Sequence, residues 1–596
     1  MRNTVRRAHR EAEMLYKNKL GTLIKENNKC FWKYVKSKRG KKTGISSIIS
    51  QSGDLVFDAK GIANALNAQY KKVFCDATHS SKIYTPNCRT SETMPPVCID
   101  YNGIVGLLEN IKANKASGPD GISGTMLKCC AKVAAMFLKF IFEQSLATGD
   151  IPADWRNAIV HPVFKGGNSK QPENYRPISL TCICCKMMER ILVSSITTYL
   201  EETNQLHHNQ YGFRRHFSCE SQLIALCEDT LSSLDKRCSV DLAFIDFSKA
   251  FDTVSHDCLI EKLNTYNLDT KVRSWIKSFL TNRTQRVIID NCQSDEITVT
   301  SGVAQGSVIG PILFLLYIND LPDRMKCSIR MFADDVVIYT NVMGGIGSSS
   351  KLQEDLNMLI RWCEEWKMSV NVKKCAIMRM SRNKCAVTPA YYLCNSVIPV
   401  VNEFKYLGVI ISNTGSWQKH VDYVASKSNQ MLRFIKRTFK GCPQSVKESV
   451  YVSLVRPLLE YSSCAWDPCA EGLKHQLEMV QRRAARFVLN NYTRDSSVSE
   501  MLSEIGWNLL ETRRKIARLC LMFNIYHGYG NLGNHIEKPH YVSRNDHQKK
   551  IRRIQSQLLS YHNSFFPKTI REWNQLNGEA MQVKTVQEFK AMLQPS

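Results

Sequence analysis

Two adjacent aspartates, Asp334 and Asp335, interrupt a pair of β-prone apolar runs within residues 330–339. Aspartate is disfavoured inside strands and tolerated in tight turns, so this pattern predicts a β-hairpin that carries both carboxylates at its tip. Taken alone, the segment is equally consistent with an ordinary aspartate-rich turn. A second acidic site elsewhere in the chain is needed to decide between the two interpretations.

A third carboxylate, Asp246, lies near the end of another mostly apolar run, and Phe251 and Asp252 follow it in what we expect to be the start of a helix. A carboxylate at the end of a buried strand is costly unless it is paired or bound to metal. Asp246 and Asp334 can meet if their strands are neighbours. Three such carboxylates suit two Mg²⁺ ions, which prefer carboxylates, substrate phosphates and water, and a two-metal site can catalyse nucleotidyl transfer.

Six motifs, in order along the chain, resemble those of reverse transcriptases, and more narrowly those of non-LTR retrotransposons of the jockey-like and long interspersed kind. The matching segments are 174–180, 210–214, 243–252, 301–311, 332–335 and 404–408. The resemblance covers about residues 114–411 and continues more weakly through 454–461 and 564–567. Full-length elements of this kind usually carry an endonuclease ahead of the polymerase, and we expect none in this chain.

The resemblance implies an α+β fold with the right-hand architecture of polymerases: fingers, a ferredoxin-like palm with the catalytic β-hairpin, and a helical thumb. The α+β class also follows from strands and helices that alternate between 240 and 411 without a regular βαβ period. We expect five parts, which are a basic helical segment 1–44, an N-terminal extension with the start of the fingers 45–155, the reverse transcriptase domain 156–411, the thumb 412–535 and a basic C-terminal segment 536–596.

Apolar periodicity and turn residues predict the individual elements. Strands are expected at 240–247, 287–290, 329–339, 375–380 and 406–411, and helices at 126–146, 182–202, 256–280, 311–320 and 351–367. The glycine- and serine-rich patch 344–350 is expected to be a flexible loop. Four tryptophans of the C-terminal third are expected to anchor a core, namely Trp417, Trp466, Trp507 and Trp573.

The resemblance assigns catalysis and metal binding to Asp246, Asp334 and Asp335, with the backbone carbonyl of Phe247 as a further metal ligand. Two Mg²⁺ ions are the implied cofactor, with Mn²⁺ as a substitute. Asp252 is expected to cap or pair locally rather than to act in catalysis.

Further residues are expected to bind the substrates. Those for the incoming nucleotide are Lys165, Arg176, Phe251, Gln305, Gly306 and Lys374, and those that face the template in the fingers are Gln210, Phe213 and Arg214. Cationic side chains suit triphosphate oxygens, and Lys374 would either protonate the departing pyrophosphate or steer it. The Phe251 ring would clash with a 2′-hydroxyl, unless it is simply a core residue.

Charge, apolar content and cysteine content indicate which partners and which compartment to expect. The formal net charge is +26, which favours a polyanionic partner, although a membrane surface or solubility alone could also account for it. Residues 1–44 hold 14 Lys and Arg against three Glu, and the segment is equally consistent with a solvated helix or a nucleic-acid-contacting arm.

The longest apolar run, 308–318, is shorter than the roughly 20 residues that span a membrane. The 23 scattered cysteines predict a reduced, intracellular protein in the cytoplasm or nucleus.

These features together predict an RNA-directed DNA polymerase that copies retrotransposon RNA, with a DNA primer at its target and deoxynucleoside triphosphates as substrates. The main alternative is an inactive or truncated remnant that only binds nucleic acid. An intron maturase or a telomerase-like polymerase is a second alternative, which the Phe-Ala pair ahead of Asp334 and the segment 454–461 disfavour.

Overall fold

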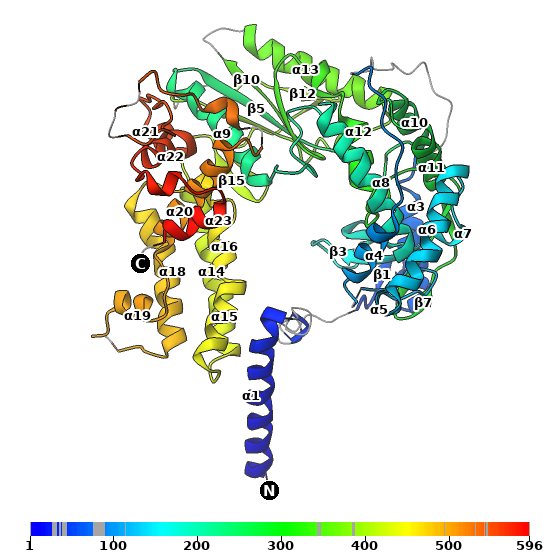
Figure 1. Cartoon of the computed structure of the whole chain (residues 1–596), viewed down its shortest axis with the longest axis horizontal. Helices are drawn as coiled ribbons and strands as arrows, with labels where there is room; N and C mark the ends of the chain where they lie inside the picture. The colour runs from blue at the N-terminus through cyan, green and yellow to red at the C-terminus, as the bar shows by residue number, and fades with distance from the viewer. Residues whose placement is uncertain are drawn as a thin grey trace.

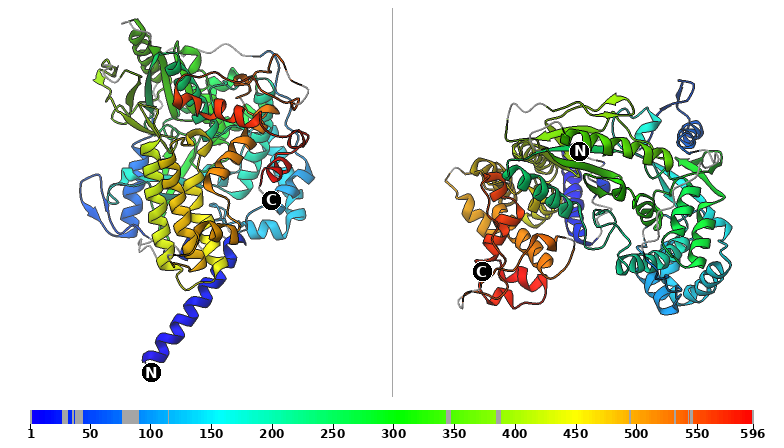
Figure 2. Two further views of the ribbon diagram at one scale, coloured as in Figure 1. Left: turned by 90° about the vertical axis from the view of Figure 1, so that its left-hand side faces the viewer. Right: turned by 90° about the horizontal axis from the view of Figure 1, so that it is seen from above.

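The computed structural model describes residues 2–26, 32–34, 37, 44–75, 90–113, 115–342, 347–383, 388–493, 495–530, 532–541, 543 and 546–594. Its elements form an arch, with the C-terminal helices on one side, a sheet at the top and the N-terminal half of the chain on the other side (Figure 1). Helix α1 (Arg2–Glu26) packs against α15 (Gln444–Leu454) and projects away from the rest of the chain (Figure 2). The expected basic N-terminal helix is therefore present over these residues.

A four-stranded antiparallel sheet lies at the centre of the arch. Its strands, in spatial order, are β11 (Ala376–Met380), β5 (Ser239–Asp246), β10 (Asp335–Val342) and β9 (Ser328–Phe332). Strand β5 is buried on both faces, because its alternate side chains enter two separate cores. Ala243 and Ile245 face the first core, and Leu242 and Phe244 face the second.

The first core joins one face of this sheet to helices from the N-terminal half and the middle of the chain. They are α4 (Tyr101–Glu109), α5 (Gly124–Cys129), α6 (Ala131–Thr148), α7 (Ala153–Arg156), α8 (Ile183–Glu202), α10 (His256–Asn264), α11 (Thr270–Leu280), α12 (Gly310–Ile318) and α13 (Gly347–Glu365). Helix α12 is apolar on all sides, and every residue from Ile312 to Ile318 is buried. A helix of this composition can only be stable inside a core.

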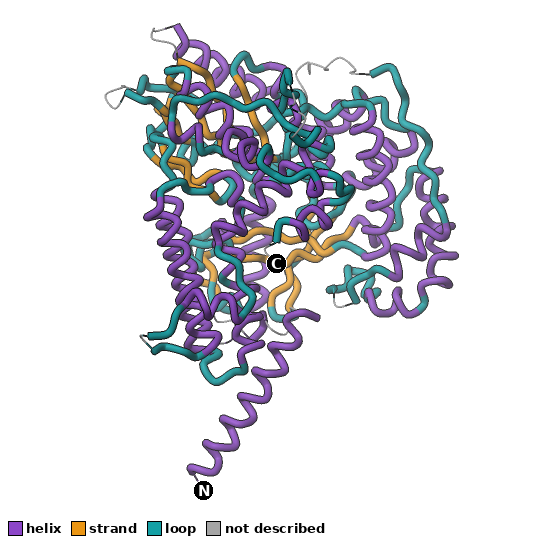
Figure 3. The backbone as a smooth tube through the Cα atoms, turned by 60° about the vertical axis from the view of Figure 1, so that its left-hand side comes forward, coloured by secondary structure: helices purple, strands orange, loops and turns teal. Residues whose placement is uncertain are grey.

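A second, mixed sheet lies apart from the first, as the two groups of strands in Figure 3 show. It contains β3 (Asn157–Phe164), β4 (Tyr175–Leu180), β6 (Arg283–Ile289), β7 (Cys292–Gln293) and β8 (Ile297–Val299). Strand β3 pairs antiparallel with β4 and parallel with β6. Helix α3 (Ala59–Lys71) covers β6 and forms a small third core with it.

The second core joins the other face of the central sheet to α9 (Cys219–Asp235) and to the C-terminal helices. These are α14 (Gln418–Thr438), α15, α16 (Arg456–Glu460), α17 (Ser463–Trp466), α18 (Glu471–Leu489), α19 (Val498–Glu504), α20 (Leu510–Tyr526), α21 (Leu559–His562), α22 (Phe565–Trp573) and α23 (Val586–Met592). Trp466, Trp507 and Trp573 are buried in this core and Trp417 packs against it. The prediction that these tryptophans are core anchors is confirmed.

Three short hairpins complete the sheets. They are β1 (Ile48–Ile49) with β2 (Leu55–Val56), β12 (Tyr392–Leu393) with β13 (Ser396–Val397), and β14 (Glu403–Tyr406) with β15 (Val409–Ser412). Across the described parts of the chain, none of the helices has both the length and the apolar content that crossing a membrane requires.

Several expected elements are divided in the structure. The strand expected at 406–411 is the hairpin β14–β15, which turns at Leu407 and Gly408, both with positive φ. The helix expected at 256–280 breaks into α10 and α11, because Asn267 takes a positive φ and Asp269 caps α11. The helix expected at 126–146 is also divided, at Cys130, into α5 and α6.

Two local expectations are wrong. The residues after Asp246 form a turn rather than a helix, and the next helix, α10, begins only at His256. Within the expected flexible loop at 344–350, residues 347–350 belong to helix α13. Residues 344–346 of that loop lie outside the described residues.

Candidate active site

The three predicted carboxylates meet at one edge of the central sheet. Asp246 is the last residue of β5, and Asp335, the first residue of β10, lies opposite it in the antiparallel register. Asp334 occupies the turn between β9 and β10. The predicted hairpin with an aspartate pair at its tip is therefore confirmed, and the strand pairing brings Asp246 to the same point.

The turn before Asp334 has an unusual backbone. Ala333 takes a φ of +55°, which is left-handed, and its side chain is 3% exposed. A residue with a Cβ atom pays roughly 1–2 kcal/mol for this conformation. Such strain persists only where surrounding contacts enforce it, and it is common at functional sites.

Among the described residues, the only ion pair that reaches the three carboxylates is that between Asp246 and Lys374. Burial raises the pKa of Asp334, and the nearby charge of Asp246 raises it further. Loss of surrounding water, together with the charges of Asp334 and Asp246, raises the pKa of Asp335 to about 6, although this side chain keeps contact with solvent. The Oδ2 atom of Asp246 is buried and accepts no hydrogen bond, and its nearest cation is the Lys374 ammonium at 3.3 Å.

This chemistry fits a divalent cation held at an open edge. Among the described residues, no three His, Cys, Asp or Glu side chains close around a common point, so the site is not a preformed cage. Mg²⁺ usually binds through one or two carboxylates and completes its coordination with water and substrate phosphates. The Asp246 oxygen that pairs only with the exposed Lys374, and the mutual repulsion that raises the pKa values of Asp334 and Asp335, suit such an arrangement.

A pocket of about 520 Å³ opens beside the carboxylates, between the central sheet and the second sheet. Asp246 and Asp334 lie on its wall, and its cationic lining consists of Lys165, Arg176, Lys249, Arg283 and Lys374. Burial lowers the pKa of Lys165, and so do Lys374 and Arg176, while Asp246 and Asp334 act in the opposite direction. Cations and carboxylates thus line the same pocket, an arrangement suited to a polyanion that arrives with metal ions.

Phe251 lies on the pocket wall in the turn that follows β5. Its ring stacks on Phe314 of α12, with centroids 4.4 Å apart, and meets the edge of Phe213 at 6.2 Å. The ring is half-buried, so it is both packed from behind and presented to the pocket. Lys249, in the same turn, takes a φ of +48°.

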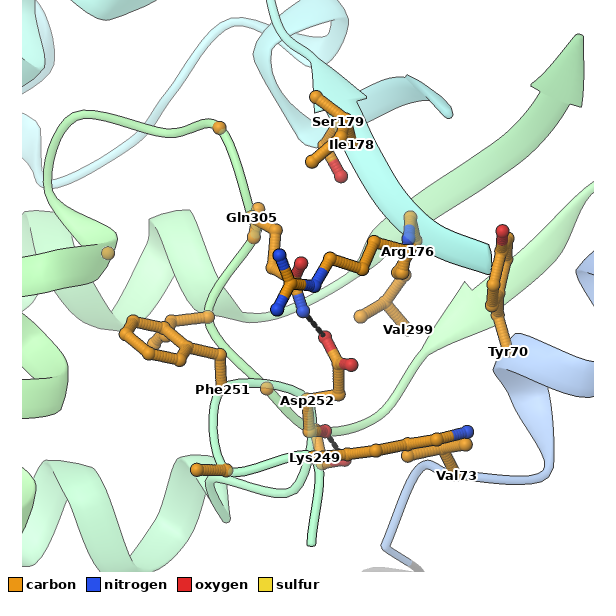
Figure 4. Close-up of a pocket in the computed structure, with 18 of the residues that line it drawn as sticks. Tyr70, Val73, Arg176, Ile178, Ser179, Lys249, Phe251, Asp252, Val299 and Gln305 are labelled. Atoms are coloured by element: carbon orange, nitrogen blue, oxygen red, sulfur yellow. Dashed lines mark hydrogen bonds between the residues drawn. The ribbon is translucent and has the colours of Figure 1, made fainter. Parts of the chain in front are cut away.

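Gln305 and Gly306 form the part of the pocket that touches β4. The Nε2 atom of Gln305 donates to Oδ1 of Asp252 at 2.8 Å, as Figure 4 shows. Burial raises the pKa of Asp252 to about 6, and its local pairing agrees with the sequence prediction. Gly306 has a φ of +119°, and a Cβ atom there would lie 2.6 Å from the carbonyl oxygen of Ser179, so only glycine fits.

The three residues expected to face the template have different surroundings in the structure. Phe213 is 54% exposed and lines the pocket. Arg214 instead turns away, because its guanidinium pairs with the Glu201 carboxylate at 2.6 Å. Gln210 is fully buried beneath the catalytic turn.

Sequence analysis missed several residues of the pocket, among them Lys249 and Tyr70. Lys249 stands inside the matching segment 243–252, so its position was a usable signal. Tyr70 comes from α3, far outside the matching segments, and nothing in its sequence surroundings marks it. It is 4% exposed, and its hydroxyl has no hydrogen-bond partner (Figure 4).

The sequence family described as "Reverse transcriptase (RNA-dependent DNA polymerase)" matches residues 165–411, a range that holds all three carboxylates. Residues 165–411 are related to reverse transcriptases. The matched range therefore contains β4 through β14, most of β15 and, apart from Tyr70, Val73, Phe74 and Ala158, all of the pocket lining.

The chain is also similar to polymerases of mobile elements. It is 27% identical to the "Probable RNA-directed DNA polymerase from transposon BS" of Drosophila melanogaster, over 66% of this chain and 45% of that protein. It is 26% identical to the "RNA-directed DNA polymerase from mobile element jockey" of Drosophila funebris, over 82% of this chain and 56% of that protein. The predicted relationship to non-LTR reverse transcriptases is confirmed. The chain spans about half the length of these curated relatives.

Proposed function

We propose that this chain is an RNA-directed DNA polymerase that copies the RNA of a non-LTR retrotransposon into DNA. The observation that carries the proposal is the meeting of Asp246, Asp334 and Asp335 at one edge of the central sheet, where Asp246 and Asp334 line a pocket with cationic walls. The reverse transcriptase match at 165–411 and the likeness to the jockey polymerase support the same function.

The right-hand architecture of polymerases is part of this proposal. The central sheet would be the ferredoxin-like palm, and the sheet of β3, β4 and β6 would belong to the fingers. The C-terminal helices would be the thumb, and Arg433, Lys436, Arg482 and Arg483 on α14 and α18 give them cations for a nucleic-acid backbone. The five sequence parts expected above, with boundaries at 44, 155, 411 and 535, stay a prediction.

The pocket residues that were predicted from the sequence have proposed roles. Lys165 and Arg176 would bind the triphosphate, and Gln305 and Gly306 would contact the nascent base pair. The carboxylates of Asp246, Asp334 and Asp335, with the Phe247 carbonyl, would hold two Mg²⁺ ions.

When bound, these ions would activate the primer 3′-hydroxyl and stabilise the leaving pyrophosphate. Lys374 pairs with Asp246 and is 56% exposed, so it can turn toward the pyrophosphate and either donate a proton or hold its charge. Phe251 would restrict the sugar to deoxyribose.

An RNA template, a DNA primer and deoxynucleoside triphosphates are the proposed partners, with priming from nicked target DNA. The net charge of +26 supports binding to nucleic acid. The second candidate, a remnant that only binds nucleic acid, predicts the same binding without synthesis.

The decisive experiment is primer extension by the purified chain on poly(rA)/oligo(dT) with labelled dTTP and Mg²⁺. We expect metal-dependent synthesis that Asp334→Asn reduces by about 10²–10³-fold or more, since it removes charge next to the reacting atoms. Asp257→Asn is the matched control, because Asp257 is an exposed residue in the first turn of α10. Synthesis that Asp334→Asn leaves at the parental rate would exclude this site, and salt-sensitive binding without any synthesis would favour the remnant.

A further inference from the structure

The loop 207–213 is fastened to the strand that leads into the catalytic turn. The backbone N–H of Tyr211 donates to the Met331 carbonyl at 2.8 Å, and the N–H of Met331 donates to the Asn209 carbonyl at 2.9 Å. These two bonds form a short parallel bridge between the loop and β9. The bridge brings Gln210 to the base of the turn that holds Asp334.

The Gln210 side chain completes this connection. Its Oε1 atom accepts the backbone N–H of Ala333 at 3.0 Å and the N–H of Gly212 at 2.8 Å. Ala333 is the left-handed residue directly before Asp334, so its N–H direction fixes how the Asp334 carboxylate leaves the turn. Gly212 is equally constrained, because a Cβ atom there would lie 2.5 Å from the Ala333 nitrogen.

We propose that Gln210 is a positioning residue, whose amide oxygen holds the strained Ala333 turn and so aims Asp334 at the metal and nucleotide. The sequence prediction gave Gln210 a contact with the template instead. That contact needs a polar atom at the surface, whereas Gln210 is 0% exposed and its Nε2 atom is buried without a partner. The positioning role rests on the proposed polymerase function for its kinetic test, but the hydrogen bond itself can be tested separately.

The kinetic test compares Gln210→Met with the parent in primer extension. Methionine has a similar length and volume but offers no comparable acceptor, so it removes the bond without opening a cavity. We expect kcat to fall at least about tenfold, with the KM for dTTP and the Kd for primer–template each within about twofold. Adding Ala333→Gly should restore at least about threefold of the lost kcat, because glycine adopts the left-handed backbone without the bond.

Gln205→Met is the matched control. Gln205 lies in the segment just before the same loop and is also 0% exposed, but its amide donates to the Thr203 hydroxyl at 2.9 Å. We expect this variant to keep the parental kcat. A loss of kcat equal to that of Gln210→Met would mean that any buried glutamine of this region is needed for folding, and the proposal would be wrong.

Hydrogen exchange tests the bond without any activity. In the parent, the Ala333 amide within a peptide such as 328–337 should exchange slowly, and in Gln210→Met it should exchange at least about tenfold faster. Unchanged protection, or a raised primer–template Kd with kcat intact, would overturn the proposal and return Gln210 to the template. If the parent itself makes no DNA, the polymerase function fails, while the exchange result still decides whether Gln210 holds the turn.

Discussion

Two groups of acidic side chains in this chain are built in opposite ways. Asp467, which follows α17, is 3% exposed and is neutralised on the spot by three cations, Arg514 at 2.6 Å, Arg518 and Lys568 at 2.6 Å. Burial alone would raise the pKa of Asp467, but the three cations hold it below its ordinary value. At the catalytic edge, by contrast, burial and mutual repulsion raise the pKa values of Asp334 and Asp335.

The difference lies in where the countercharges stand. Around Asp467 they touch the carboxylate, so the charge of this acid is compensated and the ion pairs tie α17, α20 and α22 together; we call this the complete cluster, although three guanidinium nitrogens of Arg514 and Arg518 have no hydrogen-bond partner. At the catalytic edge Lys374 pairs with Asp246, whereas Asp334 and Asp335 form no ion pair with any described residue. Removing the anion of a complete cluster costs stability, whereas the uncompensated carboxylates of an incomplete one leave room for a charged ligand.

The largest expected effect is on the complete cluster. Asp467→Asn leaves buried Arg514 without its paired anion and leaves Arg518 with Glu572 alone, which should lower the free energy of unfolding by about 3–5 kcal/mol. Urea unfolding measures this loss, and Asp257→Asn should stay within about 0.5 kcal/mol of the parent. A loss below about 1 kcal/mol would show that the two clusters are not opposites.

Phe251 sharpens the comparison at the open site. Phe251→Ala should admit UTP far better relative to dTTP, because a steric clash of about 2–3 kcal/mol corresponds to roughly thirty- to more than a hundredfold discrimination. The ratio of incorporation efficiencies for dTTP and UTP measures the change. Phe314→Leu, which alters the ring behind Phe251, serves as the control for packing. An unchanged ratio in a folded Phe251→Ala variant would make Phe251 a core residue only.

The two clusters should also differ in how their contributions to activity and stability depend on pH. Because the pKa of Asp335 is raised to about 6, polymerisation should fall up to about tenfold per unit as the pH drops below that value. The raised pKa also means that Asp335 favours folding below its unfolded pKa of about 3.9, and that this contribution is lost as the pH rises through 6. Asp467 has the opposite sign, since its contribution is lost only as the pH falls through its lowered pKa.

That prediction is checked with a pH profile of single-turnover extension and with metal-free urea unfolding of Asp335→Asn. The variant should lose the stability change that the parent shows between about pH 4 and 6. An equal pH dependence of metal-free unfolding in Asp335→Asn and the parent would contradict the raised pKa of the open site.

The smallest expected effect concerns the N-terminal helix. Binding to a primer–template should weaken with salt by a slope of about 0.7–0.9 per neutralised phosphate. Deleting residues 1–42, which lie in a segment with 14 basic and three acidic residues, should lower that slope. Fluorescence anisotropy at several salt concentrations measures it, and an unchanged slope would assign α1 to packing against α15.

Some of the site follows from sequence and some does not. β-propensity predicted a hairpin with Asp334 and Asp335 at its tip and a strand that ends at Asp246, but it left open whether these strands are neighbours, which the register of β5 and β10 shows. The pattern could not place Tyr70 of α3, since tertiary packing alone brings it to the pocket. It also could not tell that Gln210 points inward, because a motif fixes which residue is present and not where its side chain lies.

The most direct test of the open acidic edge is Mn²⁺ binding, measured from the free Mn²⁺ signal in electron paramagnetic resonance. The protein is mixed with a dideoxy-terminated primer on RNA and with dTTP, so that no turnover occurs. We expect the parent to bind two ions, Asp334→Asn to lose at least one of them or bind it more than tenfold more weakly, and Asp257→Asn to match the parent. Equal Mn²⁺ binding by Asp334→Asn and the parent would contradict the account.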